Sequence, residues 1–295
     1  MAPRSLVMTR LMLKAARNPV LRTPASIGLN FENVAFKATG GVDLVGWFIP
    51  ATAAGKEKSV RGPVVVWVHG WMWNRIGNVA GKVPFVDRDV DFLPATRALH
   101  DAGYHVLLFD LSNHGESGSR LPATYGPREA RDYCGAVNYL RGRPDVDENR
   151  IGVIGTSMGG NIALYGTPQC QPIKAVLAVQ PVIQGHFNRK FARLELGPLG
   201  PAMAKSADLL YLLMGAPPPS LHNPSIPARQ LGQTLVKYVQ GTGDPWGTMA
   251  DVEAMQAVTP NTLPIVRYPS TDRYEGYSYV SNKVPEVVEF FTANV

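Results

Sequence analysis

The stretch IGVIGTSMGGN, residues 151–161, decides the fold. Its first residues form a short apolar run of the kind that makes a buried strand, and the residues from Met158 onward favour a helix. Gly155 and Gly159 stand two positions before and after Ser157, which indicates a turn too tight for a Cβ atom on either side of the serine. The stretch therefore predicts a strand that passes through a sharp turn at Ser157 into a helix.

Strand and helix patterns alternate along the chain around this stretch. Apolar runs predict strands at 63–69, 105–111, 151–155, 173–180, 235–240 and 264–268. Helical patterns lie between and after them, at 92–102, 127–141, 158–165, 248–258 and 284–291. Two earlier runs, 33–39 and 44–50, indicate a hairpin. The alternation predicts an α/β fold, with a mostly parallel central sheet and helices on both faces.

Residues 182–232 interrupt this alternation. They contain a helical stretch around 202–214 and a proline-rich run that continues to Pro227. The insertion is too long for a simple connection, so it predicts a small helical cap over one end of the sheet. We therefore expect an N-terminal segment, residues 1–31, followed by one α/β domain, residues 32–295, that carries the cap.

The composition is that of a folded protein with a large core. Of the 295 residues, 45% are hydrophobic and 18% are charged, which excludes general disorder. No apolar run reaches the roughly 20 residues that a membrane-spanning helix needs. Cys134 and Cys170 are too few for a disulfide framework, so we expect a cytoplasmic protein. The sequence has no metal-ligand cluster, phosphate loop or dinucleotide fingerprint, and no cofactor or metal is expected.

Positive charge gathers at the N-terminus. Residues 1–31 contain five basic residues and no acidic one, with leucines between them, which predicts a basic amphipathic helix. Such a helix either packs its leucines on the body of the protein, the more common case, or makes a peripheral contact with an anionic membrane. The net charge is +6, but the other basic residues do not gather on one element beside aromatic residues that could stack on bases. No nucleic-acid partner is therefore expected.

Ser157 lies at the centre of a G-x-S-x-G pentapeptide between the predicted strand and helix. A nucleophile elbow requires this context, because the turn exposes the serine hydroxyl at the N-terminus of a helix, where negative charge is favoured. We interpret Ser157 as a catalytic nucleophile or as the relic of one.

From about Thr23 to Val295 the chain resembles the α/β-hydrolase superfamily, and its beginning resembles the branch of dienelactone hydrolases and serine-aminopeptidase-like esterases. The matching stretches, in order, are VVVWVHGW at 64–71, DLSNHGESG at 110–118, the pentapeptide, and GTGDP at 241–245. The resemblance implies that the backbone N–H groups of Trp71 and Met158 form an oxyanion hole and that Asp244 is the triad acid. It also implies a small acyl substrate, such as a carboxylic ester.

The general-base histidine of that family is missing from the stretch where the resemblance places it, residues 268–276. Arg273 stands there instead, and no histidine follows Asp244. A guanidinium group has no lone pair with which to accept the serine proton, so Arg273 does not replace the base. We expect a buried ion pair between Arg273 and Asp244 where the family has its Asp–His pair.

Two functions stay open at this point. The first is a weak serine hydrolase, for which His186 or His222, in the predicted cap, is the candidate for a relocated base. The remaining histidines are expected to be structural or remote from the serine; they are His69, His100, His105 and His114. The second is a non-catalytic relative that binds a small acyl or apolar ligand or a protein partner, with Arg273 holding a carboxylate. The fold alone does not choose between them.

Overall fold

An eight-stranded sheet forms the centre of the molecule in a computed structural model that describes residues 4–51, 61–83 and 85–295. The strand order is β1-β2-β6-β3-β7-β8-β9-β10. β1 and β2 are antiparallel to their neighbours, and the strands from β6 to β10 are parallel. This sheet confirms the predicted fold class. Its strands are β1 Glu32–Lys37, β2 Asp43–Ile49, β3 Gly62–Val68, β6 His105–Phe109, β7 Val146–Thr156, β8 Ala175–Val179, β9 Leu235–Gly241 and β10 Val266–Tyr268.

The central strands are covered on both faces. Every residue of β3, β6 and β8 is buried, which is why their sequences are continuous apolar runs and do not alternate with polar residues. Successive side chains of β3 point to opposite faces: Val66 belongs to one hydrophobic cluster and Trp67 to the other.

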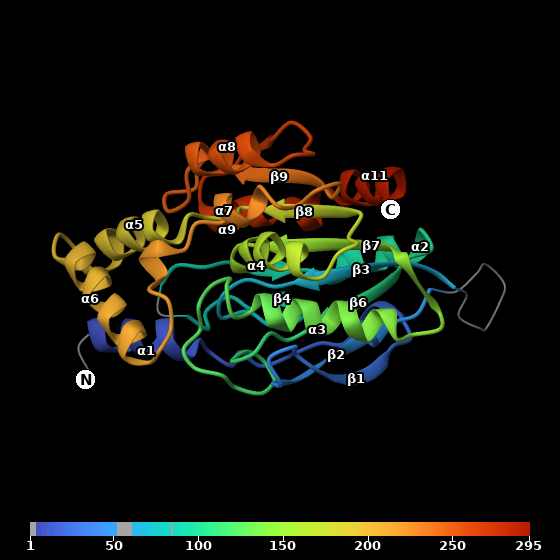
Figure 1. The fold of residues 1–295 in the computed structure, drawn as a ribbon, viewed down its shortest axis with the longest axis horizontal. Helices are drawn as coiled ribbons and strands as arrows, with labels where there is room; N and C mark the ends of the chain where they lie inside the picture. The colour runs from blue at the N-terminus through green and yellow to red at the C-terminus, as the bar shows by residue number, and fades with distance from the viewer. Residues whose placement is uncertain (1–3, 52–60, 84) are drawn as a thin grey trace.

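Helices close each face of the sheet (Figure 1). The cluster on one face includes buried residues of α3, α4 and α8, and the cluster on the other includes those of α2 and α11. The helices are α2 Leu93–Asp101, α3 Ala130–Arg141, α4 Met158–Gly166, α8 Met249–Val258, α9 Arg273–Tyr277, α10 Tyr279–Asn282 and α11 Val284–Asn294. Three short 3-10 helices, η1 Pro24–Ile27, η2 Thr167–Gln169 and η3 Pro219–Leu221, and a two-stranded ladder, β4 Gly77–Asn78 with β5 Val90–Asp91, complete the description.

The segment between β8 and β9 is a helical insertion in the sheet, at the position of the predicted cap. It holds α5 Gln184–Leu196, α6 Gly200–Leu213 and α7 Ser225–Ala228, and α5 and α6 extend to the left end of the molecule in Figure 1. The sequence indicated α6 but not α5. The apolar residues that place α5 on the body, Phe187 and Phe191, are one turn apart among polar and charged neighbours, which is a weak signal.

The N-terminal segment contains α1, Arg4–Lys14, which lies beside α6. Met8 is buried, Met12 is partly buried against the core, and Arg10 and Lys14 are exposed, as expected for a packed surface helix. The hydroxyl of Tyr211 on α6 donates to the Met12 carbonyl at 3.0 Å. None of the helices in the described ranges is long and apolar enough to cross a membrane.

Candidate active site

Ser157 lies on the sharp turn between β7 and α4. Its φ of 55° and ψ of −119° are strained for a residue with a side chain, and such strain is held only where the surroundings enforce it. The Ser157 N–H donates to the Val179 carbonyl at 2.8 Å, which fixes the turn against β8. A Cβ atom at Gly159 would overlap the Val68 carbonyl oxygen, and one at Gly155 would crowd Gly159. The predicted turn and the reason for its glycines are both confirmed.

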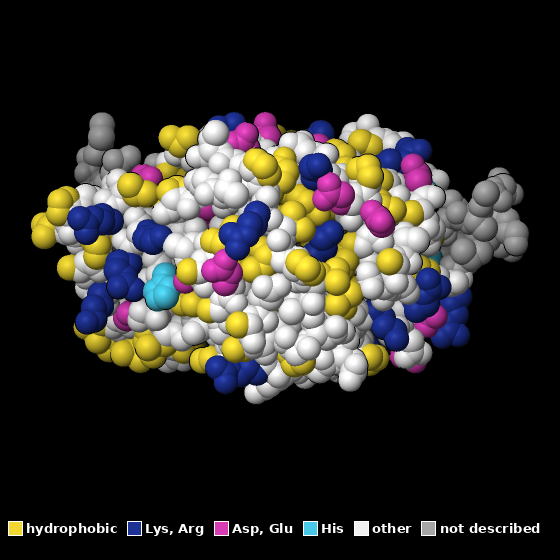
Figure 2. All heavy atoms as spheres, turned by 90° about the horizontal axis from the view of Figure 1, so that it is seen from above, with side chains coloured by type: hydrophobic (Ala, Val, Ile, Leu, Met, Phe, Trp, Pro, Cys, Tyr) yellow, Lys and Arg dark blue, Asp and Glu magenta, His cyan; other side chains and the backbone are white. Residues whose placement is uncertain are grey.

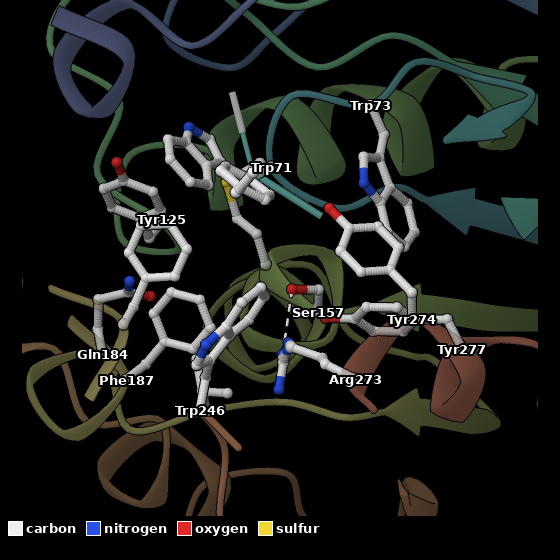
Figure 3. Close-up of a pocket in the computed structure, with 14 residues that line it drawn as sticks. Trp71, Trp73, Tyr125, Ser157, Gln184, Phe187, Trp246, Arg273, Tyr274 and Tyr277 are labelled. Atoms are coloured by element: carbon white, nitrogen blue, oxygen red, sulfur yellow. Dashed lines mark hydrogen bonds between the residues drawn. The ribbon is translucent and has the colours of Figure 1, made fainter. Parts of the chain in front are cut away.

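Arg273, the first residue of α9, points into the same site (Figure 3). Its side chain is 2% exposed, and its Nη1 donates to the carboxylate of Asp244, whose side chain is 0% exposed. Its Nη2 donates to the Gln180 carbonyl at 2.9 Å and to the Ser157 Oγ at 3.3 Å. The predicted ion pair is therefore confirmed, and the guanidinium group contacts the serine hydroxyl.

The charge of Arg273 is stabilised by its surroundings. Burial by itself lowers the pKa of the guanidinium, but the attraction of Asp244 and the contact with Tyr277 outweigh it, so the net pKa shift is upward. Arg273 also lies 5.1 Å from the ring centres of both Phe187 and Tyr277, within the range of cation–π attraction. The side chain is thus held as a cation and as a hydrogen-bond donor.

Asp244 is saturated with donors besides Arg273. Its Oδ1 accepts from the N–H groups of Trp246 at 2.9 Å and Gly247 at 3.0 Å, and its Oδ2 accepts from the Gln240 side chain at 3.1 Å. The loop after β9 therefore wraps around the carboxylate, which balances the charge of Arg273 without help from a ligand.

Gln180 holds Arg273 from the end of β8, a role that no motif in the sequence indicated. Its backbone has φ 51°, its carbonyl accepts from Arg273, and its side-chain nitrogen donates to the Arg273 carbonyl at 2.8 Å. Its Oε1 accepts from the Gly241 N–H at 3.3 Å. This reciprocal bonding fixes both the main chain and the side chain of Arg273 at the edge of the sheet.

The hydroxyl of Ser157 opens on a pocket with about 480 Å³ of empty space, part of it open to solvent. Its wall is mostly aromatic, and the rings pack edge to face: those of Trp73 and Tyr277, and those of Phe191 and Trp246, are 4.9 Å apart. Burial raises the pKa of the Tyr277 phenol to about 12, so it stays protonated near neutral pH and is not a base. The aromatic residues that line the pocket are Trp71, Trp73, Phe85, Tyr125, Phe187, Phe191, Trp246, Tyr274 and Tyr277.

The two residues whose N–H groups the resemblance assigns to an oxyanion hole, Trp71 and Met158, both line this pocket. Among the residues that the structure describes, neither N–H donates to a protein acceptor. The loop before Trp71 is fixed by His69: its Nδ1–H donates to the Gly70 carbonyl at 2.8 Å and its Nε2 accepts from the Leu111 N–H at 3.0 Å. His69 is therefore a structural residue, as expected, and burial lowers its pKa to about 4.

Neither candidate for a relocated base lines the pocket of Ser157. His186, on α5, is hydrogen-bonded through Nδ1 to Asp251 of α8 at 2.7 Å, and it faces a separate groove between α5 and α6. His222 is buried, and burial lowers its pKa to about 4. Within the part of the chain that the structure describes, the lining of the pocket contains no histidine.

Known proteins resemble this chain in sequence and in fold. The sequence model of the Alpha/beta hydrolase family matches residues 65–289. Among curated proteins, YfhR of Salmonella typhimurium, described as uncharacterized, is 32% identical over 139 residues, which are 47% of this chain and 41% of YfhR. The thiohydrolase aneE of Aspergillus aculeatus is 28% identical over 131 residues, 44% of this chain and 37% of aneE. The chain thus matches less than half the length of these relatives.

Among solved structures, the Pyrococcus furiosus esterase Pf2001 has a TM-score of 0.67 to this chain at 23% identity. The match covers 95% of this chain and 98% of the esterase. The α/β-hydrolase GrgF from Penicillium has a TM-score of 0.64 at 19% identity, over 90% of this chain and 99% of GrgF. At such identities the likeness shows a shared fold.

Proposed function

Because the chain belongs to the α/β-hydrolase family, we propose that it is a slow serine hydrolase of carboxylic esters or related acyl compounds, with Ser157 as the nucleophile. Family membership supports a hydrolase-type function. The observation that carries the proposal is the placement of the Ser157 hydroxyl, on a strained turn beside an aromatic pocket, with Arg273 as its hydrogen-bond donor.

In the proposed reaction, Ser157 Oγ attacks the acyl carbon and the N–H groups of Trp71 and Met158 hold the carbonyl oxygen as it gains charge. The guanidinium of Arg273 favours negative charge on Oγ but takes no proton, so the serine proton leaves to water or hydroxide. The leaving alkoxide takes a proton from water and departs as the alcohol, and a second water then hydrolyses the acyl-serine. Without a general base, acylation loses a factor of about 10²–10⁴, which makes the enzyme slow.

The surroundings of the serine favour an uncharged, apolar substrate. Trp71 and Phe191 are shared walls between this pocket and a second cavity between α1, α5 and α6, which has about 540 Å³ of empty space, part of it open to solvent. Met8, Met12 and Met203 line this cavity, and methionine side chains adapt to irregular apolar groups. A ligand carboxylate would have to compete with Asp244 for Arg273, so a neutral acyl compound fits better.

Binding without cleavage is the second candidate function. It is favoured by one observation: the described lining of the pocket offers Ser157 a donor, Arg273, and no histidine to take its proton. In that case the pocket holds the same class of apolar acyl compound and releases it unchanged.

Hydrolysis of p-nitrophenyl acetate and butyrate, with fluorophosphonate labelling of Ser157, tests the proposal. We expect slow, Ser157-dependent turnover in the wild type and an increase of about 10²-fold or more in Arg273→His, which places an imidazole beside Asp244. Arg273→Gln, which removes the charge without adding a base, is the matched control and should show no increase.

The outcomes separate the candidates. Labelling in Arg273→His but not in the wild type would support binding without cleavage. Fast wild-type turnover that depends on Ser157 would mean that another group acts as base. No labelling in any form would refute the assignment of Ser157 as nucleophile, and the double variant Ser157→Ala/Arg273→His controls for labelling elsewhere.

A further inference from the structure

Exposed large hydrophobic side chains are concentrated in one part of the molecule. Ten of the fourteen found among the described residues lie between residues 194 and 226, in the cap. Five are consecutive or nearly so at the end of α6, with exposed fractions from 40% to 75%: Leu209, Leu210, Leu212, Leu213 and Met214. A surface helix ordinarily turns polar residues to water, and a contiguous apolar patch of this kind marks an interaction site.

The packing of α6 fixes the outward direction of these leucines. Ala207 and Tyr211 are its buried side chains in this half, and Tyr211 is anchored by its hydrogen bond to the Met12 carbonyl. At 100° per residue, Leu209 and Leu213 lie away from Ala207 and Tyr211 on the helix surface. They therefore face outward for as long as α6 keeps its contacts with α1.

Basic side chains outnumber acidic ones in the cap. Residues 184–229 contain five basic side chains and two acidic ones, Glu195 and Asp208. The five basic residues, all exposed, are Arg189, Lys190, Arg193, Lys205 and Arg229. Figure 2 shows hydrophobic and basic side chains side by side at the left end of the molecule, the end that Figure 1 shows to be formed by α5 and α6.

We propose that the cap docks on an anionic lipid bilayer, with the leucines of α6 entering the boundary between headgroups and acyl chains and the basic residues lying among the headgroups. A cap surface that combines exposed leucines on α6 with lysine and arginine, most of them on α5, fits such a bilayer in both apolar area and charge. A second copy of this chain fits less well, because pairing the same faces would bring the two sets of basic residues together. The proposal is independent of catalysis.

Co-sedimentation with phosphatidylcholine vesicles, with and without phosphatidylglycerol, tests it on the full chain. We expect the wild type to bind the vesicles that contain phosphatidylglycerol and Leu209→Glu/Leu213→Glu to lose about tenfold in partitioning. The matched control is Leu21→Glu/Val86→Glu, which adds the same charges at positions 60% and 87% exposed, against 60% and 75% for the cap pair. It should lose far less partitioning than the cap variant. Arg189→Gln/Lys205→Gln should weaken binding to the anionic vesicles, and circular dichroism checks that all variants are folded.

Equal loss of binding in both glutamate variants would overturn the proposal, because added negative charge alone would then account for it. Unchanged binding of the cap variant would assign the contact to another part of the chain. A wild type that ignores vesicles but forms dimers in light scattering, lost in Leu209→Glu/Leu213→Glu, would show that the patch pairs with a second copy.

Discussion

The ion pair between Asp244 and Arg273 predicts a large loss of stability on Asp244→Ala. Both side chains are almost fully buried, and the alanine would leave the guanidinium charged without a counterion. Removing one partner of a buried pair costs about 3–5 kcal/mol. Arg273 would keep its bonds to the Gln180 carbonyl and to Ser157, which limits the loss, but the N–H groups of Trp246 and Gly247 would also lose their acceptor.

The expected change in melting temperature follows from chain length. An unfolding entropy of about 2.1 cal/mol/K per residue gives about 0.6 kcal/mol/K for the whole chain, so a loss of 3–5 kcal/mol lowers Tm by about 5–8 °C. Asp244→Asn should lose less, because an amide oxygen still accepts from Trp246 and Gly247 while the charge is gone. Calorimetry or thermal circular dichroism measures both.

A double-mutant cycle separates the charge effect from the cavity. Arg273→Met removes the cation but keeps a flexible apolar side chain between Phe187 and Tyr277. We expect the variant with both changes to be more stable than the sum of the single losses by about 2 kcal/mol or more, because neither charge is then left alone. A wild-type melting curve for Asp244→Ala, or additive losses, would refute the reasoning.

Three further predictions concern the turn, the second cavity and the buried His69. Gly159→Ala should abolish fluorophosphonate labelling of Ser157 and lower Tm, because the new methyl group overlaps the Val68 carbonyl; labelling at the wild-type rate would contradict this. Ala207→Trp should fill the second cavity, so the turnover of p-nitrophenyl decanoate should fall while that of p-nitrophenyl acetate stays the same. An equal change in the turnover of both esters would mean that the acyl chain binds elsewhere. Burial lowers the pKa of His69 to about 4, below the unfolded value of 6.5. The neutral imidazole therefore stabilises the fold above pH 6.5. This contribution to stability is lost as the pH falls from 6.5 towards 4, by at most about 1.4 kcal/mol per pH unit. Urea unfolding at pH 7 and pH 5 should show a smaller pH dependence in His69→Gln than in the wild type.

Features set by local sterics could be predicted from the sequence. The turn at Ser157 follows from its two glycines, and the buried strands follow from continuous apolar runs. The pairing of Asp244 with Arg273, 29 positions apart, came from the order of motifs in a resembling family, because spacing alone does not bring two loops together.

Features that depend on tertiary contact could not be predicted. The aromatic wall is assembled from the loop at Trp71, from α5, from the loop at Trp246 and from α9, and each ring by itself has the signature of ordinary core. Gln180 carries no motif either. Its importance comes from φ 51° at the end of β8 and from its bonds to Arg273, 93 positions away.

One carbonyl oxygen connects three parts of the chain. The Met12 carbonyl of α1 accepts from the hydroxyl of Tyr125, which lines the serine pocket, at 2.8 Å, and from that of Tyr211 on α6 at 3.0 Å. A sideways shift of α6 would therefore move the atom that also holds Tyr125 in the pocket wall. The cap and the serine pocket are thus coupled through one hydrogen-bond acceptor of the N-terminal helix. Losing the Met12 carbonyl as an acceptor would leave the two phenols with only each other as partner, at a cost of about 1–3 kcal/mol.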